Sequence, residues 1–238
     1  MPAQSSPLDR SVPSKDIPVV QRLENRLPAV LSAVAGMVDV ISFVSLKLFT
    51  AHVTGNLVVI AALLVRGGPP NPAQILAVPV FILAVAGVWL IAKLLNKRGP
   101  ALAKPLLLVQ FLLLACVLIV AVVYHPAADP HGVTAGIAAM IAVSAMACQF
   151  ALLRLAVPGA PSTAVMTGNL TKTTLSLLDT FSGSVPVVED ARMQLKKTVQ
   201  LVAGFFAGCL LGAAAFSWLG EWAWLLPVVL AAVAAALP

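Results

Sequence analysis

Charged residues are scarce in this chain, and their scarcity excludes an ordinary soluble domain. Only 10% of the 238 residues are Asp, Glu, Lys or Arg, whereas about a quarter of the residues are charged in a typical soluble domain. Apolar residues make up 60% of the sequence, and the mean hydropathy is +0.99. This composition predicts an all-α integral membrane protein whose main partner is the lipid bilayer.

Cysteine is also scarce, and the basic residues do not cluster, so two further classes are excluded. Cys116, Cys148 and Cys209 each stand in an apolar run without a CxxC spacing, which predicts neither a metal site nor a disulfide framework. The net charge of +6 comes from basic residues scattered between apolar runs, so nucleic acid is not an expected partner. The sequence also lacks a metalloprotease motif, a P-loop and a nucleotide fingerprint, so we expect neither an enzyme nor a bound cofactor.

Six stretches are long and apolar enough, or nearly so, to cross a bilayer as helices. A crossing helix needs about 20 apolar residues to span a hydrocarbon layer of roughly 30 Å. The six predicted spans cover residues 28–47, 73–95, 105–124, 133–153, 199–218 and 222–238. Residues 1–27 are polar and rich in proline, and we predict that they form a cytoplasmic N-terminal arm.

Two shorter segments, 56–65 and 169–181, begin with the same four residues. Thr54-Gly55-Asn56-Leu57 in the first recurs 113 residues later as Thr167-Gly168-Asn169-Leu170. One long span precedes each short segment and two follow it. This order predicts a duplication, with membrane repeat 1 at residues 28–131 and membrane repeat 2 at residues 132–238.

The positions of Lys and Arg favour one topology for the short segments. Basic residues in short loops stay on the cytoplasmic side. If all eight segments crossed the membrane, the loop that holds Lys93, Lys97 and Lys104 would be external. If each short segment instead enters and leaves by one face, every basic residue except Lys47, Arg66 and Lys172 is cytoplasmic. We therefore predict six transmembrane helices plus two re-entrant half-helices in an inverted repeat, placed in a bacterial inner membrane with the N-terminus in the cytoplasm.

The two repeated motifs are expected to meet near the membrane midplane, where transporters often bind their solute. The threonines are good helix caps, the glycines permit close approach of backbone, and the asparagines supply amides. The start of a helix is partly positive, which favours a polar or anionic ligand. These predicted substrate-binding residues are Thr54, Gly55, Asn56, Thr167, Gly168 and Asn169. The alternative interpretation is that they form packed helix ends without a solute.

Four other polar residues are candidates for the same site. Asp39 lies inside the first span, where a charge needs either a function or a partner. Gln149 is its predicted counterpart in the second half, if the alignment contains a gap of three residues. Lys172 follows the second motif and calls for an anion, which could be Asp39 or a solute. His52 precedes the first motif, where it either titrates along the path or makes a structural hydrogen bond.

Gly204, Gly208 and Gly212 are spaced by four residues and so share one helix face. Small residues at this spacing allow two helices to approach closely. The face predicts packing against another helix, either within the chain or in a homodimer.

The sequence resembles the YoaK-like bacterial membrane proteins, a family of unknown function. The resemblance rests on Gly36-x-x-Asp39, His52-Val53-Thr54-Gly55-Asn56, the segment from Thr163 to Leu170 and the glycine-rich segment from Gly204 to Gly212. The chain departs from the family pattern Gly-x-Gln-Asn-Ala at Ala147-Cys148-Gln149-Phe150-Ala151, where Phe150 replaces Asn. The resemblance implies a multi-span inner-membrane protein and no particular substrate.

These patterns lead to one main functional hypothesis and two alternatives. The main hypothesis is a transporter or channel for a small polar or anionic solute. The first alternative is a scaffold or accessory subunit that transports nothing. The second is an exporter, centred on Asp39, that is coupled to protons or cations.

Overall fold

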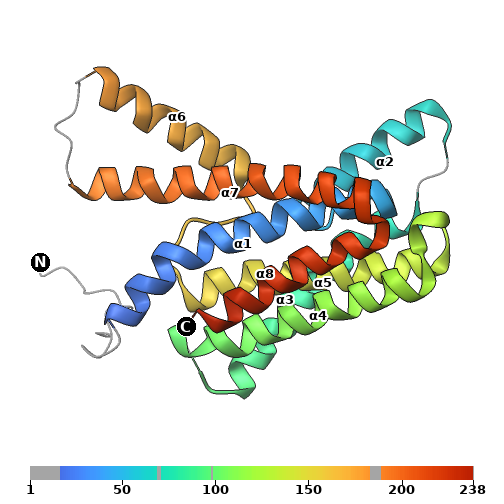
Figure 1. The fold of residues 1–238 in the computed structure, drawn as a ribbon, viewed down its shortest axis with the longest axis horizontal. Coiled ribbons are helices and arrows are strands. Elements are labelled where there is room, and N and C mark those ends of the chain that lie inside the picture. The colour runs from blue at the N-terminus through green and yellow to red at the C-terminus, as the bar shows by residue number, and fades with distance from the viewer. Residues whose placement is uncertain (1–16, 69–70, 98, 183–188, 238) are drawn as a thin grey trace, which may run out of the picture.

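The long apolar runs form long helices that lie roughly along the longest axis of the molecule (Figure 1). The computed structural model describes residues 17–68, 71–97, 99–182 and 189–237, and this part of the chain contains eight α-helices and no strand. The α-helices are α1 (Ile17–Leu46), α2 (Gly55–Arg66), α3 (Pro72–Leu94), α4 (Ala103–Tyr124), α5 (Val133–Ala156), α6 (Met166–Ser182), α7 (Glu189–Leu219) and α8 (Leu225–Ala236). Three short 3₁₀ helices, η1 (Gly99–Leu102), η2 (Pro126–Ala128) and η3 (Gly220–Trp224), occur in the connections.

Five helical stretches are long and apolar enough to cross a membrane, which supports the predicted class of protein. They are Arg26–Leu46, Pro72–Leu94, Gly99–Tyr124, Val133–Ala156 and Arg192–Ala236. The last stretch has 45 residues and would be about 68 Å long if it were straight, roughly twice the thickness of the hydrocarbon layer. It folds back on itself instead, because Gly220 adopts a φ of 56° between α7 and α8 (Figure 1).

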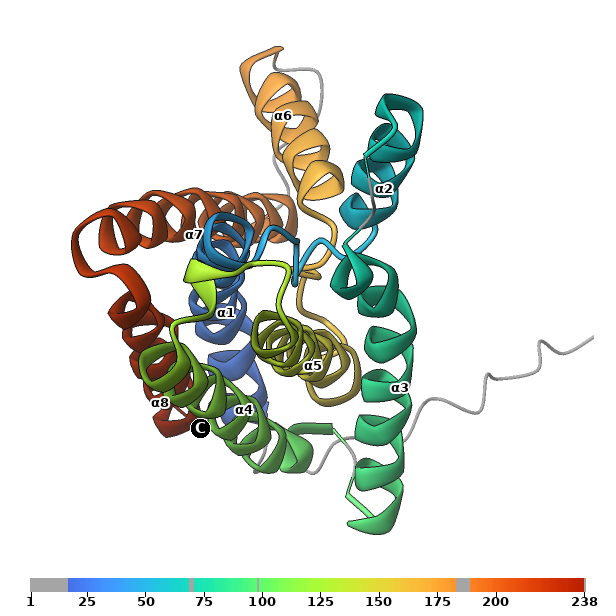
Figure 2. The same ribbon diagram turned by 90° about the vertical axis from the view of Figure 1, so that its right-hand side faces the viewer.

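The short helices α2 and α6 diverge from the middle of the molecule. Each begins near the centre of the long axis, and the two run toward opposite ends (Figure 1). Both project from the same side of the bundle of long helices (Figure 2). Most of their residues are exposed, but Asn56 and Asn169 near their starts are buried.

The helix contacts of the two halves correspond to one another. Helix α1 packs along α7, and the equivalent helices of the second half, α5 and α3, also pack together. In the same way α2 contacts α3 while α6 contacts α7, and α4 contacts α5 while α8 contacts α1. This pattern is what a duplicated fold with intertwined halves would produce.

Helices α1 and α5 lie at the centre of the bundle (Figure 2). In both helices 67% of the most apolar stretch is buried inside the chain, compared with 11% for α3. Helix α3 therefore presents most of its apolar surface outward, as expected of a helix that faces lipid.

Several helix ends differ from those predicted. Helix α1 begins at Ile17, so residues 17–27 of the predicted arm continue directly into the first long helix, and residues 1–16 lie outside the described residues. Helix α7 begins at Glu189, ten residues before the predicted span 199–218. Apolar run length alone misses such extensions, because charged residues such as Glu, Lys and Arg also favour helix beyond the hydrocarbon layer.

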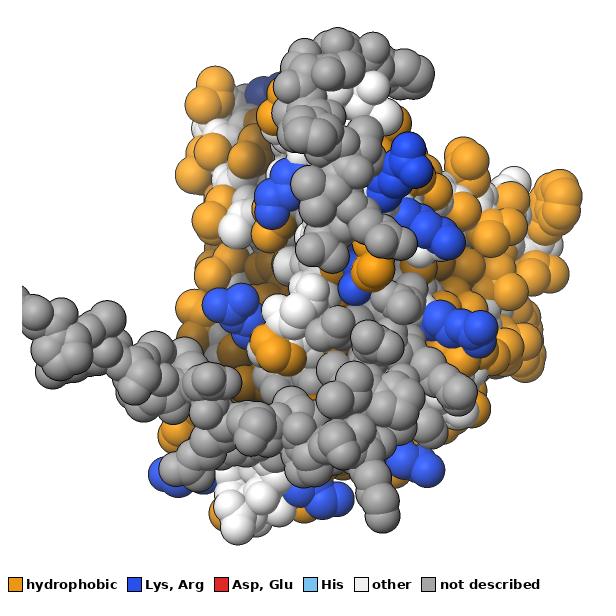
Figure 3. Space-filling view, turned by 90° about the vertical axis from the view of Figure 1, so that its left-hand side faces the viewer, with side chains coloured by type: hydrophobic (Ala, Val, Ile, Leu, Met, Phe, Trp, Pro, Cys, Tyr) orange, Lys and Arg blue, Asp and Glu red, His pale blue; other side chains and the backbone are white. Residues whose placement is uncertain are grey.

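Lys and Arg side chains gather at one end of the long axis, which we call the basic end (Figure 3). The helix ends that meet there carry Arg26, Lys93, Lys97, Lys104, Arg154, Arg192, Lys196 and Lys197. The opposite end carries Lys47 and Arg66 and the connection 125–132, which has no Lys or Arg. Which end faces the cytoplasm stays a prediction from this asymmetry.

The glycine face of α7 packs against α1 of the same chain. A Cβ atom added at Gly204 would lie 2.7 Å from the Ala29 carbonyl oxygen, and one at Gly208 would overlap the Ala33 carbonyl. Ser32 strengthens the contact, because its hydroxyl donates to the Leu201 carbonyl at 2.6 Å. Gly204, Gly208 and Gly212 therefore pack against α1 within the chain, as one of the two predicted arrangements has it.

Candidate functional site

Asp39 organises the turn that leads into α2. The residue is buried, and its Oδ1 atom accepts from the backbone N–H groups of Thr50 at 2.9 Å, Ala51 at 2.7 Å and His52 at 3.4 Å. Its Oδ2 atom lies 2.5 Å from His52 Nδ1. The partner of this buried carboxylate is therefore His52 and the turn backbone, and not Lys172, which is exposed on α6.

Asn56 fixes the same turn from the other side. Its Oδ1 atom accepts from the Phe49 N–H at 2.9 Å, and its Nδ2 atom donates to the Phe49 carbonyl at 2.8 Å. The Asn56 side chain is completely buried. Its amide thus serves the fold of the turn, in agreement with the interpretation of the motif as a packed helix end.

Gln149 performs the corresponding task in the second half. Its Nε2 atom donates to the Leu31 carbonyl at 2.9 Å and to Thr163 Oγ1 at 3.2 Å, and its Oε1 atom accepts from Gln110 at 2.8 Å. Thr163 lies in the connection that leads into α6, just as Thr50 lies in the connection before α2. Asp39 and Gln149 therefore both anchor the approach to a short helix, as their predicted equivalence requires.

The asparagines of the two motifs also correspond. Asn169 Nδ2 donates to the Ser162 carbonyl at 2.7 Å, seven residues upstream, the same separation as between Asn56 and Phe49. Thr50-Ala51 and Thr163-Ala164 extend the repeated motif upstream at the same offset of 113 residues. The repeat is thus Thr-Ala-x-x-Thr-Gly-Asn-Leu. Its first variable position is His52 in one half and Val165 in the other, and its second is Val53 or Met166.

The predicted capping by the two motif threonines does not occur. Thr54 precedes α2 but makes no side-chain capping bond, because its backbone is already helical, with φ −65° and ψ −21°. The first N–H groups of α2 instead donate to the carbonyls of the preceding turn, for example Gly55 to His52 at 2.8 Å. Thr167 lies inside α6, which begins one residue earlier at Met166. The expected free amides at the start of α2 are therefore already hydrogen-bonded.

A cavity of about 410 Å³ lies where the Asp39–His52 pair meets the first residues of α6. Its polar lining comes from Asp39, His52 and Thr167, and three aromatic rings, Phe43, Phe49 and Phe205, supply much of the remainder. Phe43 and Phe49 stack with their centroids 4.6 Å apart, and the Phe205 and His52 rings form a T-shaped pair with centroids 5.2 Å apart. We call this cavity the central pocket.

The central pocket includes only some of the residues predicted for the site. Asp39, His52 and Thr167 line it, and Thr54, Gly55, Asn56, Gly168, Asn169, Gln149 and Lys172 are not among its lining residues. Asn56, Asn169 and Gln149 are buried and bonded to backbone or side chains nearby. Three of the ten predicted site residues therefore line the central pocket.

The aromatic lining was missed by the sequence reasoning. The repeated motifs are polar, whereas Phe43, Phe49 and Phe205 come from α1, the following turn and α7. The spacing of Phe43 and Phe49 around the end of α1 gives no helical pattern, and Phe205 is distant in sequence, so no simple signal unites them. Within the described residues, no group of three or more His, Cys, Asp or Glu side chains could hold a metal ion.

Comparison with known families identifies the family to which the chain belongs. The model of the family described as "Protein of unknown function (DUF1275)" matches residues 27–237, so the chain belongs to that family. The predicted membership of an uncharacterised family is confirmed at this level, while the YoaK-like name and the bacterial origin stay predictions. No curated protein and no solved structure matches the chain.

Proposed function

We propose that this member of the DUF1275 family is a membrane transporter for a small polar or anionic solute, which binds in the central pocket. In this proposal the chain crosses the membrane six times, because α7 and α8 are separate crossings, and α2 and α6 enter from opposite faces as re-entrant helices. The observation that carries the proposal is the position of the Asp39–His52 pair, in a cavity at the point where the two short helices begin.

His52 is the group best suited to exchange a proton with the solute. Asp39 Oδ2 faces Nδ1 and favours the tautomer with a hydrogen on that atom, which leaves Nε2 as the remaining proton acceptor. The His52 side chain is 31% exposed, whereas that of Asp39 is 6% exposed. Asp39 is therefore a positioning residue, and His52 is the residue that can contact a solute.

A small carboxylic acid fits the pocket better than an inorganic ion does. Its acidic proton can pass to His52 Nε2, which leaves a carboxylate beside an imidazolium. The carboxylate then lies near the first turn of α6, a partly positive helix end to which Thr167 belongs. The rings of Phe43, Phe49 and Phe205 offer an apolar surface to the rest of the molecule.

Transport of weak acids into proteoliposomes tests this proposal. We expect wild-type protein to carry a small aromatic or branched carboxylic acid down a proton gradient, and His52→Gln to slow that flux by about 100-fold, the low end of what a positioned proton-transfer group contributes. Asp39→Asn should retain the fold of the turn but lose the dependence of flux on the proton gradient. His125→Asn, at an exposed histidine outside the pocket, is the matched control and should behave as wild type.

The outcome that contradicts the proposal is equally specific. If wild type and His52→Gln gave the same flux for carboxylic acids, neutral polar solutes and small anions, the central pocket would not be a transport site. Folding of each variant is checked by its elution as a single species in detergent.

A scaffold without transport is the second candidate, and one observation favours it. Asn56, Asn169 and Gln149 direct their amides at the protein's own backbone and side chains, which is how purely structural motifs behave. Absence of flux for every solute class, together with co-purification of a stoichiometric membrane partner, would favour this function over transport.

A further inference from the structure

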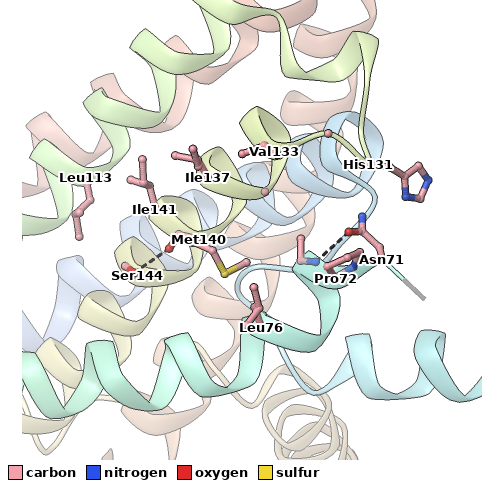
Figure 4. A pocket seen from close by; sticks show the side chains of 13 residues that line it. Asn71, Pro72, Leu76, Leu113, His131, Val133, Ile137, Met140, Ile141 and Ser144 are labelled. Carbon is pink, nitrogen blue, oxygen red and sulfur yellow. Dashed lines mark hydrogen bonds between the residues drawn. The ribbon is translucent and has the colours of Figure 1, made fainter. Parts of the chain in front are cut away.

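A second groove lies away from the central pocket, between α3, α4 and α5 (Figure 4). Its volume is about 550 Å³, and residues from all three helices line it, including Leu76, Leu113, Ile137 and Met140. None of its lining residues belongs to the central pocket. We call it the α3–α5 groove.

The groove is polar at one end only. His131 lies at the end opposite the basic end, beside Asn71, whereas Leu113 and Ser144 lie at the far end (Figure 4). Asn71 accepts from the Ala73 N–H and donates to the Pro130 carbonyl, so His131 supplies the polar group that can bind a ligand. The Ser144 hydroxyl donates to the Met140 carbonyl at 2.8 Å, so it is already hydrogen-bonded. A ligand that fills the groove must therefore have a polar head and an apolar tail.

The depth of the groove matches half of a bilayer. From Val133 at the start of α5 to Ser144 the helix rises about 17 Å, and one leaflet contributes about 15 Å of hydrocarbon. Leu113 of α4 lies at a similar depth, since it is 11 residues from the end of that helix at Tyr124. The groove thus begins at the membrane surface and ends near the midplane.

An imidazole and a carboxylate lie at the polar end. His131 lines the groove, and the carboxylate of Asp129 lies against Gly132, which also lines it. A headgroup with a phosphate and an ammonium group complements this pair better than a purely anionic headgroup does.

The groove is not a general consequence of the fold. The equivalent helices α7 and α1 of the other half are closed by Gly204, Gly208 and Gly212, where an added Cβ atom would meet the backbone of α1. At Gly136 in the α3–α5 groove an added Cβ atom would meet nothing within 4 Å. Open space has been kept in one of two otherwise equivalent helix contacts.

We propose that the α3–α5 groove binds one acyl chain of a zwitterionic phospholipid from the leaflet at the His131 end. The chain lies along α5 between α3 and α4, and the headgroup rests against His131 and Asp129. The bound lipid fills the space that glycine contacts close in the other half. This site is independent of the proposed transport function.

A photoactivatable lipid tests the proposal directly. The protein is reconstituted into vesicles that contain phosphatidylethanolamine with a diazirine in the middle of one chain, and the labelled residues are mapped after illumination. We expect label to concentrate on Ile137, Met140 and Ile141, and Gly136→Phe to reduce it there by about tenfold, or 1.4 kcal/mol of binding free energy. Gly87→Phe is the matched control, because a Cβ atom there also meets nothing within 4 Å and Gly87 lies on α3 outside the groove. It should leave the labelling unchanged.

Four results would overturn the proposal. Label spread evenly over the outward-facing residues of α3 would mean that no specific site exists. Undiminished label in Gly136→Phe, or in Leu76→Phe on the opposite wall if the first variant fails to fold, would place the lipid elsewhere. Efficient cross-linking of Leu76→Cys between two copies in the same vesicles would show that a second copy, and not a lipid, occupies the groove. Equal labelling by a phosphatidylglycerol probe would overturn the assignment of a zwitterionic headgroup.

Discussion

The two halves of the chain use the same backbone device with different side-chain chemistry. In both halves a long helix holds the turn before a short helix, and an asparagine clamps a carbonyl seven residues upstream. The anchor is the charged Asp39 with His52 in the first half and the neutral Gln149 with Thr163 in the second. The asparagine clamps, which both halves share, therefore maintain the fold. The ionisable Asp39–His52 pair, which is found in the first half, is the group that can accept and release a proton.

The helix contacts differ in a similar way. The contact of α1 with α7 is closed by glycines, whereas the equivalent contact of α5 with α3 leaves a groove of about 550 Å³. Two contacts that occupy corresponding places in the order of helices therefore differ in how closely they are packed.

The glycine contact and the groove can be distinguished by adding the same side chain to each. We expect Gly208→Leu to cost more than about 3 kcal/mol and to prevent folding, because the new Cβ atom overlaps the Ala33 carbonyl, which is backbone and cannot yield. Gly136→Leu should fold normally, since its Cβ atom meets nothing within 4 Å. Melting temperature and yield in detergent measure both effects. Equal damage by the two substitutions would show that the interfaces are packed alike.

The two anchors can be compared by removing each of them. Asp39→Ala leaves three backbone N–H groups and His52 without their acceptor, so we expect a loss of about 3–5 kcal/mol. Gln149→Ala removes three neutral hydrogen bonds and should cost about 1–3 kcal/mol. Thermal unfolding of both variants in the same detergent gives the comparison. A larger loss for Gln149→Ala would mean that the charged anchor contributes little to the fold.

The asparagine clamps should show the smallest difference. Asn56→Ala breaks two hydrogen bonds with Phe49, for an expected loss of about 2 kcal/mol. Asn169→Ala breaks the bond to the Ser162 carbonyl, for about 1 kcal/mol. If either variant kept its melting temperature but lost transport, the asparagine would be a solute ligand, and the clamp would be incidental.

The sequence was sufficient to predict the class of fold and the approximate position of each helix. Run length and hydropathy located the apolar part of every long helix, and the repeated motif located both short ones. They did not predict that α1 and α7 extend beyond the apolar runs, because helix propensity outside the hydrocarbon layer depends on residues that hydropathy treats as breaks.

The candidate site was only partly predictable. Asp39, His52 and Thr167 were identified as site residues, but the pairing of Asp39 with His52 was not, because hydropathy and motif spacing say nothing of how the turn 47–54 folds back over α1. A longer alignment of the two halves could have found Thr50 and Thr163, which match at the same offset as the motifs. The aromatic lining depends on the contact of α1 with α7, and such tertiary contacts leave no local signal.

The central claim is that α2 and α6 enter the membrane from opposite faces. Single cysteines placed at Arg66, Lys97 and Arg192, in a chain whose native cysteines have been replaced, report the side of each position through a membrane-impermeant thiol reagent. The account predicts that Arg192→Cys and Lys97→Cys are labelled from one side and Arg66→Cys from the other. Labelling of Arg66→Cys and Arg192→Cys from the same side, with Lys97→Cys on the opposite side, would show that both short helices cross the membrane and would contradict the account.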